Sequence, residues 1–312
     1  MVHTIDVNIQ RKGRMLEDHL STTLSLASSI PAFSLIEFNI TELCNRTCRF
    51  CPRYNPKIYP NVNEFMDVNL YEKIIKNLKE LGYSGTILFS AFGEPLLHKK
   101  LDQLIILSKK HCPKARVEIV TNGDFVTADK LRWLFGAGLD ILLISMYDGP
   151  RQNDHFLRLK QEVGLRDDQL ILRVRYLPPE EHFGLTLSNR AGMVTINEIG
   201  VGVLTEPLKE KCFYPFYQLL VDYDGTVLLC PHDWSKRFKA GNLREHSILE
   251  VWISKVLTFA RKRLAQADRN FDPCRLCDVK GTLMGEEHAA LWEAFYQSEA
   301  IRSSVAATEV SK

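Results

Sequence analysis

The sequence predicts an α/β protein built on a parallel sheet, followed by a smaller C-terminal domain. Strand-like and helix-like segments alternate from residue 35 to about residue 177, and such repeated βα units favour a parallel sheet, either a barrel or an open sheet. After about residue 200 the pattern changes to a hairpin signal. We therefore expect an N-terminal extension, a large core domain, a small second domain and a disordered tail, at residues 1–33, 34–205, 206–302 and 303–312.

The core region alternates β-rich runs with amphipathic segments. The expected strands cover residues 34–41, 86–90, 117–121, 141–145 and 170–176. Apolar residues at helical spacing predict a helix over 66–81, ended by Gly82, and a second helix over 101–111. Thr127 is a suitable N-cap for a third helix. The run 141–145 is almost continuously apolar, as expected of a strand that is buried on both faces.

The residues beyond about 200 predict a different architecture. Two β-rich runs, 218–223 and 226–229, flank an Asp-Gly pair that is typical of a hairpin turn. We expect an apolar helix over 248–264 and a final helix near 287–297, with a CxxC loop between them.

Composition excludes several classes of protein. Of the 312 residues, 45% are hydrophobic and 25% are charged, which is unlike collagen, coiled coils or disordered chains. The formal net charge is only +2, so no basic field indicates a nucleic-acid partner. No apolar run approaches the ~20 residues of a membrane-spanning helix, and charges interrupt the N-terminus where a signal peptide needs an apolar core. We expect a cytoplasmic protein with no nucleic-acid or membrane partner, whose thiols stay reduced.

Three cysteines follow the first expected strand in a CxxxCxxC pattern: Cys44, Cys48 and Cys51. Three such thiolates can bind three irons of a [4Fe–4S] cluster and leave the fourth iron open for catalysis, whereas structural metal sites are closed by four ligands. The alternative is a zinc site with a distant fourth ligand. Structural zinc usually pairs its ligands closely, and no histidine lies between residues 50 and 98, which favours the cluster.

With this motif the sequence resembles the radical S-adenosylmethionine (radical SAM) superfamily. Phe50 stands where that family places an aromatic residue near the adenine of SAM. Further matches fall in order behind the expected strands, at Gly93, Glu94 and Pro95 and then at Thr121, Asn122, Gly123, Ser145 and Asp148. The first three resemble the family's GGEP motif, with Phe92 replacing the first glycine. Alone, the later short polar motifs are more typical of turns, and their order behind the cysteines gives them weight.

The resemblance implies a fold, a cofactor and a type of chemistry. The fold is a partial (β/α)6 TIM-like barrel, and the cofactor is SAM bound to the open iron. The backbone around Gly93 and the side chain of Glu94 would bind the amino group of SAM, while Thr121, Asn122, Ser145 and Asp148 would line the ribose and the substrate. Reductive cleavage of SAM would give a 5′-deoxyadenosyl radical that abstracts hydrogen from a substrate.

Two arginines share one face of the fifth expected strand, because Arg173 and Arg175 are two residues apart. Apolar helices cover the outside of a barrel, so we expect both in the lumen, binding the SAM carboxylate or an anionic substrate group. The alternative places both on solvent. Arg190 resembles a residue near the substrate of related enzymes, and we expect it to be catalytic. Arg190 and His182 are the candidates for accepting the proton of a substrate hydroxyl.

A second group of thiolates consists of Cys212, Cys230, Cys274 and Cys277. With Gly225 five residues before the second cysteine, it resembles the start of the SPASM extension of radical SAM enzymes. No cysteine follows Cys277, so the resemblance implies one auxiliary [4Fe–4S] cluster in a small α+β iron–sulfur domain of the shortened, twitch-like form. A zinc ribbon has similar spacing and is the alternative. We expect the remaining cysteine, Cys112, to pack inside the protein.

The cysteine inventory bears on the reaction that a radical SAM oxidoreductase of this kind would catalyse. A radical epimerase must return hydrogen, often from a thiol, and no spare cysteine is well placed. A dehydrogenation discards an electron, which the auxiliary cluster can accept. We therefore expect dehydrogenation of a polar small molecule, a sugar or aminocyclitol, with flavodoxin or ferredoxin as electron donor.

Other classes stay open. One alternative is a peptide-modifying maturase, of the RiPP or sulfatase-maturase type, although residues 1–33 are too short for the peptide-recognition domain that many such enzymes carry. A sugar epimerase is a second alternative. A non-catalytic iron–sulfur or zinc scaffold is a third, and it would leave the ordered motifs unexplained.

Overall fold

One eight-stranded sheet organises the computed structural model, which describes residues 7–21 and 30–310. Its strands lie in the order β5-β4-β3-β2-β1-β6-β7-β8. Their bounds are β1 Leu35–Phe38, β2 Thr86–Phe89, β3 Arg116–Thr121, β4 Ile141–Met146, β5 Leu170–Val174, β6 Gln218–Val221, β7 Thr226–Leu228 and β8 Lys239–Asn242. In this spatial order, every neighbouring pair from β5 through β1 to β6 is parallel. The pairs β6–β7 and β7–β8 are antiparallel.

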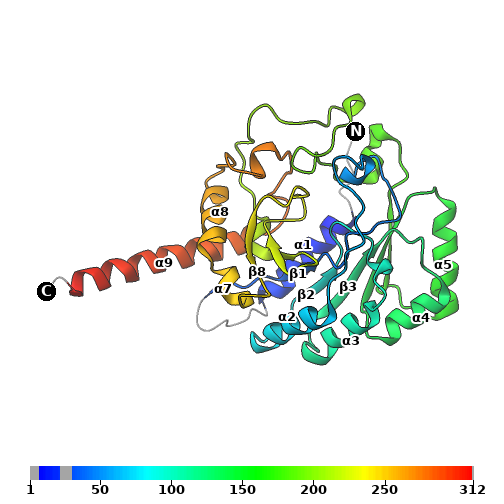
Figure 1. Cartoon of the computed structure of the whole chain (residues 1–312), viewed down its shortest axis with the longest axis horizontal. Coiled ribbons are helices and arrows are strands. Elements are labelled where there is room, and N and C mark those ends of the chain that lie inside the picture. The colour runs from blue at the N-terminus through cyan, green and yellow to red at the C-terminus, as the bar shows by residue number, and fades with distance from the viewer. Residues whose placement is uncertain (1–6, 22–29, 311–312) are drawn as a thin grey trace.

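Helices α2 to α5 cover the outer face of the parallel strands, and α7 to α9 lie with the antiparallel part (Figure 1). The helices are α1 Val7–Ser21, α2 Val68–Glu80, α3 Leu101–His111, α4 Ala128–Gly136, α5 Arg151–Val163, α6 Tyr214–Tyr217, α7 Ile248–Trp252, α8 Lys255–Ala265 and α9 Glu286–Val310. Side-chain caps fix several of their starts. The Thr127 side chain accepts from the N–H of Lys130 and caps α4, as the sequence predicts.

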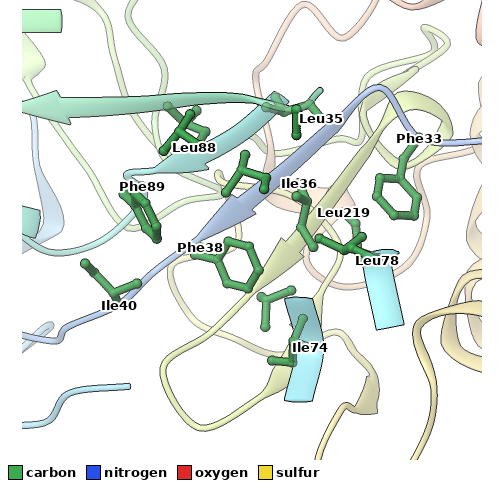
Figure 2. Packing of buried hydrophobic residues seen from close by; sticks show 14 of the residues in the cluster. Phe33, Leu35, Ile36, Phe38, Ile40, Ile74, Leu78, Leu88, Phe89 and Leu219 are labelled. Atoms are coloured by element: carbon green, nitrogen blue, oxygen red, sulfur yellow. The ribbon is translucent and has the colours of Figure 1, made fainter. Parts of the chain in front are cut away.

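The apolar residues of α2 pack on the outer face of β1. Ile36 and Phe38 are both fully buried, and Figure 2 shows them lying toward Ile74 and Leu78 of α2. Residues that alternate with these two point to the other face of the sheet. Burial of such side chains contributes roughly 1.5–3 kcal/mol each, so this layer holds the strand ends in place.

The inner face of the sheet carries several polar side chains, and α1 lies against it. Gln218 donates to the Glu37 carboxylate (2.5 Å), and Arg173 donates to the Ser145 hydroxyl (2.8 Å). On α1, Arg11 makes two hydrogen bonds to Glu118 of β3 (2.7 and 2.6 Å). Figure 1 shows α1 on the side of the sheet opposite α2 to α4. The N-terminal extension thus contributes a helix to the inside of the partial barrel.

The predicted α/β fold with a partial parallel barrel is confirmed, with a difference in its sixth parallel strand. That strand, β6, comes from the predicted hairpin and pairs with β1 rather than following β5. The sheet is therefore continuous across the boundary that we expected at residue 205. The hydrophobic pattern indicates which segments are strands but not which edge a later strand joins.

Three helical segments also differ from expectation. The helix expected over 248–264 is two helices, α7 and α8, because Ser254 accepts from the N–H of Leu257 and caps a new helix. The final helix α9 continues to Val310, into the segment expected to be a disordered tail. Helix α1 lies within the N-terminal extension, for which no element was expected. Within the residues that the structure describes, no helix is long and apolar enough to cross a membrane.

Candidate active site

The loop after β1 carries the CxxxCxxC cysteines, and short hydrogen bonds hold it in shape. Asn61 accepts from the backbone N–H of Cys44 (2.9 Å) and donates back to its carbonyl (2.9 Å). The N–H of Cys51 donates to the carbonyl of Cys48 (2.9 Å). All three thiols are half-buried. The loop therefore places three half-buried thiols beyond the carboxyl end of β1.

Burial raises the pKa of all three thiols. For Cys48, the neighbouring Cys51 and Cys44 add to the effect of burial, and its pKa rises to about 12. Such thiols ionise at neutral pH only when a cation compensates them, as a bound metal does. Across residues 7–21 and 30–310, no three His, Cys, Asp or Glu side chains converge on one ion. A [4Fe–4S] cluster places each thiolate on its own iron, and this donor set fits it.

The segment after β2 approaches this loop closely at Gly93. A Cβ atom on Gly93 would lie 2.0 Å from the carbonyl oxygen of Thr41, so only glycine fits there. The Asn39 side chain accepts from the N–H groups of both Phe92 and Gly93 (3.1 Å each). Pro95 begins a short 3-10 helix that ends at Leu97. The GEP segment is therefore fixed against β1.

Glu94 connects this segment to the end of β3. Its carboxylate accepts from the hydroxyl of Thr121 (2.7 Å), the N–H of Asn122 (2.8 Å) and the N–H of Leu96 (3.0 Å). Burial raises the pKa of Glu94 to about 7, against the lowering effect of these hydrogen bonds. A neighbouring cationic amine would favour the ionised carboxylate. This is the chemistry expected of a residue that binds the amino group of SAM.

An aromatic group lies beside the third cysteine. The ring of Phe50 stacks on Tyr147 with centroids 6.1 Å apart, and Phe183 lies 5.1 Å from Phe50. Tyr147 follows β4 directly, and Phe183 lies in the loop after β5. The sequence indicated Phe50 alone, because the other two rings belong to no motif. His182, a candidate proton acceptor, precedes Phe183 in the same loop.

The cysteine loop is also bound to the ends of β3 and β4 through Arg46. This guanidinium forms ion pairs with Asp124 and with Asp148, which we expected near the ribose. Asn122 donates to the side chain of Asn45 (2.7 Å). The structure thus brings Asn122 and Asp148 to the cysteine loop, although sequence reasoning missed Arg46 as their partner.

The two strand arginines have different surroundings. Arg173 lies on the inner face and donates to Ser145, so these two expected cofactor residues are neighbours. Arg175 is buried and donates to the carbonyls of Val174 (2.6 Å) and Gly184 (2.5 Å). Arg175 therefore also holds the loop that carries Phe183.

The second set of cysteines belongs to the C-terminal part of the chain. Cys212, Cys274 and Cys277 are buried, and Cys230 is half-buried. Burial raises the pKa of Cys230, and the other three thiols raise it further, which shows that all four lie near one another. A Cβ atom on Gly281 would lie 2.3 Å from the sulfur of Cys212. The four-thiolate donor set again fits an iron–sulfur cluster.

Arg269, which the sequence did not indicate, ties together the loops around this set. Its guanidinium is buried and donates to the carbonyls of Glu210 (2.8 Å), Lys211 (2.9 Å) and Val279 (2.8 Å). Its positive charge lowers the pKa of Cys212 and of Cys277, against the effect of burial. Arg269 thereby favours the thiolate forms that bind a metal.

Arg190 lies between the two sets of cysteines. Its charge lowers the pKa of Cys51, against burial, and also that of Tyr214, which is next to the auxiliary cysteines. The preceding Asn189 donates to the carbonyl of Leu276 in the CxxC loop (2.7 Å). Arg190 itself approaches His232, with Nη1 and Nδ1 3.3 Å apart. The loop segment that carries Asn189 and Arg190 thus connects the two cysteine sites.

Comparisons with known proteins agree with this geometry. A sequence model described as the radical SAM superfamily matches residues 38–166, and one described as an iron–sulfur cluster-binding domain, SPASM, matches residues 212–278. The S-adenosyl-L-methionine-dependent 2-deoxy-scyllo-inosamine dehydrogenase of Niallia circulans is 32% identical over 248 residues, which are 79% of this chain and 93% of that enzyme. GTP 3′,8-cyclase of Helicobacter pylori is 29% identical over 143 residues, 42% of this chain and 40% of the cyclase.

Solved structures show the same similarity. BtrN in complex with AdoMet and 2-DOIA superposes with a TM-score of 0.68 at 28% identity, over 82% of this chain and 97% of BtrN. Native anSMEcpe with bound AdoMet gives a TM-score of 0.50 at 14% identity, over 89% of this chain and 100% of that chain, and shows the fold alone.

The fold and the two thiolate sites define a metalloenzyme that holds one cluster with an open iron and a second, auxiliary cluster. The chain belongs to the radical SAM superfamily. The predicted superfamily, SPASM-type domain, SAM cofactor and two [4Fe–4S] clusters are confirmed. The protein is a radical SAM oxidoreductase, and the zinc and non-catalytic alternatives do not apply.

Proposed function

We propose that this enzyme dehydrogenates a secondary hydroxyl of a sugar, an aminocyclitol or a related polyol. The observation that carries the proposal is the position of Arg190, on a segment bound to the auxiliary CxxC loop and close enough to the radical SAM cysteines for its charge to lower the pKa of Cys51. A substrate beside Arg190 lies between the two cluster sites. The similarity to a SAM-dependent dehydrogenase over 93% of that enzyme supports the same reaction class.

The two clusters and SAM supply a hydrogen-abstracting radical and an acceptor for the electron that the substrate loses. Overall, SAM and the secondary alcohol give methionine, 5′-deoxyadenosine, the ketone and one proton. The carbon-bound hydrogen atom moves to the 5′ carbon of the adenosyl group, and the hydroxyl proton goes to solvent. The electron left on the substrate carbon balances the electron used to break the C–S bond.

The chain's own residues bind and orient the reactants. We assign Gly93 and Glu94 the binding of the methionine part of SAM, and we assign the rings of Phe50 and Tyr147 the packing against its adenine. A guanidinium donates hydrogen bonds and does not accept a proton at working pH. We therefore assign Arg190 the binding of the reacting hydroxyl oxygen, which steadies the adjacent C–H bond and stabilises charge on that oxygen as its proton leaves.

The proposal also includes an external reductant and a reducing compartment. The open-iron cluster needs one electron to begin cleavage of SAM, which a flavodoxin- or ferredoxin-type donor would supply, and the electron that the substrate loses balances it in each turnover. All eight cysteines are free thiols, and clusters with thiolate ligands form where thiols stay reduced, as in the cytoplasm.

The test uses anaerobically reconstituted full-length protein, SAM, dithionite and polyols deuterated at the hydroxyl-bearing carbons. The polyols are 2-deoxy-scyllo-inosamine, myo-inositol, glucose and glucuronate. We expect one ketone product, with deuterium in 5′-deoxyadenosine, and no product from a Cys44/Cys48/Cys51→Ala variant. Return of hydrogen to give an epimer, or turnover only with a peptide, would contradict dehydrogenation.

A further inference from the structure

Helix α1 contributes residues to the inside of the partial barrel, and it lies outside the segment that matches the radical SAM superfamily, residues 38–166. Two contacts fix how it is rotated. Arg11 binds Glu118 of β3 through both guanidinium nitrogens, and the hydroxyl of Thr86 on β2 lies 3.0 Å from the sulfur of Met15. Glu118 and Thr86 are both on the inner face of the sheet. The same face of α1 therefore looks into the barrel.

Lys12 lies on this face of α1. It is three residues before Met15 and four before Leu16, a spacing that places side chains on one side of a helix. Met15 and Leu16 are both 3% exposed and belong to the hydrophobic core. Lys12 keeps some accessible surface, whereas Arg14, on the opposite side, is exposed. The ammonium group of Lys12 is thus directed to the inner side of the sheet rather than to bulk solvent.

Lys12 is surrounded by charged side chains of the inner face of the sheet. Burial lowers its pKa, and Glu37 of β1, Glu118 and Arg173 of β5 all interact electrostatically with it. The ammonium therefore lies on the side of the sheet where Arg173 also lies.

Lys12 is not used by the fold. Among the described residues, 7–21 and 30–310, its side chain makes no hydrogen bond and no ion pair. The inner-face carboxylates have other partners, since Glu118 is held by Arg11 and Arg116, and Glu37 accepts from Gln218. The Lys12 ammonium is attracted to Glu37 and Glu118 without a hydrogen bond to either, and an oxygen ligand that carries negative charge would bind it directly.

We propose that Lys12 binds an anionic oxygen group of the substrate, a carboxylate or a phosphate, and so selects oxyanion-bearing polyols. The proposal deepens the proposed function and rests on it for the position of the substrate. Lys12, Arg173 and Arg190 together favour an anion and repel an ammonium group. The substrate would then differ in charge from the aminocyclitol named for the Niallia circulans relative.

The test measures binding rather than turnover. Reconstituted enzyme with SAM is titrated calorimetrically with glucose, glucosamine, glucuronate, glucose 6-phosphate and inorganic phosphate. Wild-type protein should bind the oxyanion sugars about 10-fold or more tightly than glucose, and glucosamine more weakly still. Glucuronate against glucose 6-phosphate shows which oxyanion fits, and inorganic phosphate shows whether the anion alone suffices. Lys12→Met should remove the preference, and Lys12→Arg should retain most of it.

Arg14→Met is the matched control, because it removes a charge from the exposed side of α1 and should leave the preference unchanged. Circular dichroism and iron content identify any variant that misfolds, and Lys12→Arg then carries the test. Tighter binding of glucosamine than of glucuronate, the absence of oxyanion binding, or an unchanged preference in Lys12→Met would overturn the proposal. Formation of ketone is scored separately. Lost preference without ketone from either protein would reject the proposed function and keep the role of Lys12.

Discussion

Arg190 and His232 lie side by side between the two cysteine sites, with Nη1 of the arginine 3.3 Å from Nδ1 of the histidine. A guanidinium can only donate, so Nδ1 is the acceptor and the ring hydrogen is on Nε2. That nitrogen faces the hydroxyl of Tyr214 at 3.2 Å. The orientation of Arg190 therefore depends on a residue of the auxiliary domain.

Replacing Arg190 by Gln should separate the oxidation of the substrate from the cleavage of SAM. Without the guanidinium, the reacting hydroxyl is poorly held, so we expect ketone formation to fall by about 10²–10³-fold. Release of 5′-deoxyadenosine should continue, because the cysteine loop and Glu94 are intact. Both products are measured by mass spectrometry, with Arg237→Gln, a change at an exposed ion pair with Asp272, as control. Parallel loss of both products would show that Arg190 serves SAM cleavage instead.

Asn189 should be important for stability around the auxiliary cluster. Its side chain donates to the carbonyls of Leu276 (2.7 Å) and Gly202 (2.9 Å) and is fully buried. Asn189→Ala leaves these groups unsatisfied and should cost about 1–3 kcal/mol in the free energy of unfolding. Denaturant unfolding measures this cost, and the exposed Asn270→Ala should cost little. Equal effects of the two changes would refute the role of Asn189 in joining the loops.

The affinity for SAM should rise with pH through neutrality. Burial raises the pKa of Glu94 to about 7, so the side chain is neutral below that pH and a carboxylate above it. Since the cationic amino group of SAM prefers the carboxylate, Kd should fall as the pH rises from about 6 to about 8, by up to about 10-fold per unit. Glu94→Gln should bind weakly at every pH, without this slope. A pH-independent Kd in the wild type would rule out the contact.

Glu94 should also make the folded protein less stable as the pH rises, although the same rise in pH strengthens the binding of SAM. Because the folded-state pKa of Glu94 lies above its unfolded value, its contribution to stability is full below the unfolded pKa of about 4.3 and is lost as the pH rises through about 7. The Tm of SAM-free protein should therefore fall between these values more steeply in wild type than in Glu94→Gln. Parallel Tm curves would contradict the raised pKa.

Phe92 has a structural reason for replacing the first glycine of the motif. Its ring packs against Trp234 of the auxiliary domain (4.9 Å) and against Tyr59 (6.5 Å). Phe92→Gly should destabilise the protein by about 3–5 kcal/mol through lost packing, whereas Phe92→Leu should cost less. Thermal unfolding of both variants measures the difference. A stable glycine variant would show that the auxiliary domain does not depend on this contact.

The sequence predicts the strands, most of the helices and the order of the motifs because each rests on local spacing. The strand ends gather Cys44, Glu94, Thr121 and Ser145 at one edge, as parallel topology requires. Partners that are distant in the chain have no such signal. Arg46, Arg269 and His232 each act through contacts with other loops, and no periodicity or motif marks them.

Helix α1 shows why some of the site is absent from a motif-based prediction. Its inner face combines Arg11 and Lys12, which interact with charged side chains of the sheet, with Met15 and Leu16, which belong to the hydrophobic core. Amphipathic patterns identify helices that cover the outside of a barrel. Such a pattern does not say which layer a helix joins, and only the three-dimensional pairing of Arg11 with Glu118 reveals the place of α1.

The central claim is that the enzyme oxidises a polyol hydroxyl with the help of two clusters. Its most direct test is to count iron, 5′-deoxyadenosine and ketone in the same anaerobic sample of wild type and of Cys212/Cys230→Ala. We predict about eight irons in the wild type, with ketone equal to 5′-deoxyadenosine, and about four irons in the variant, with 5′-deoxyadenosine but little ketone. Undiminished ketone formation in the four-iron variant would contradict a role for the auxiliary cluster in the oxidation.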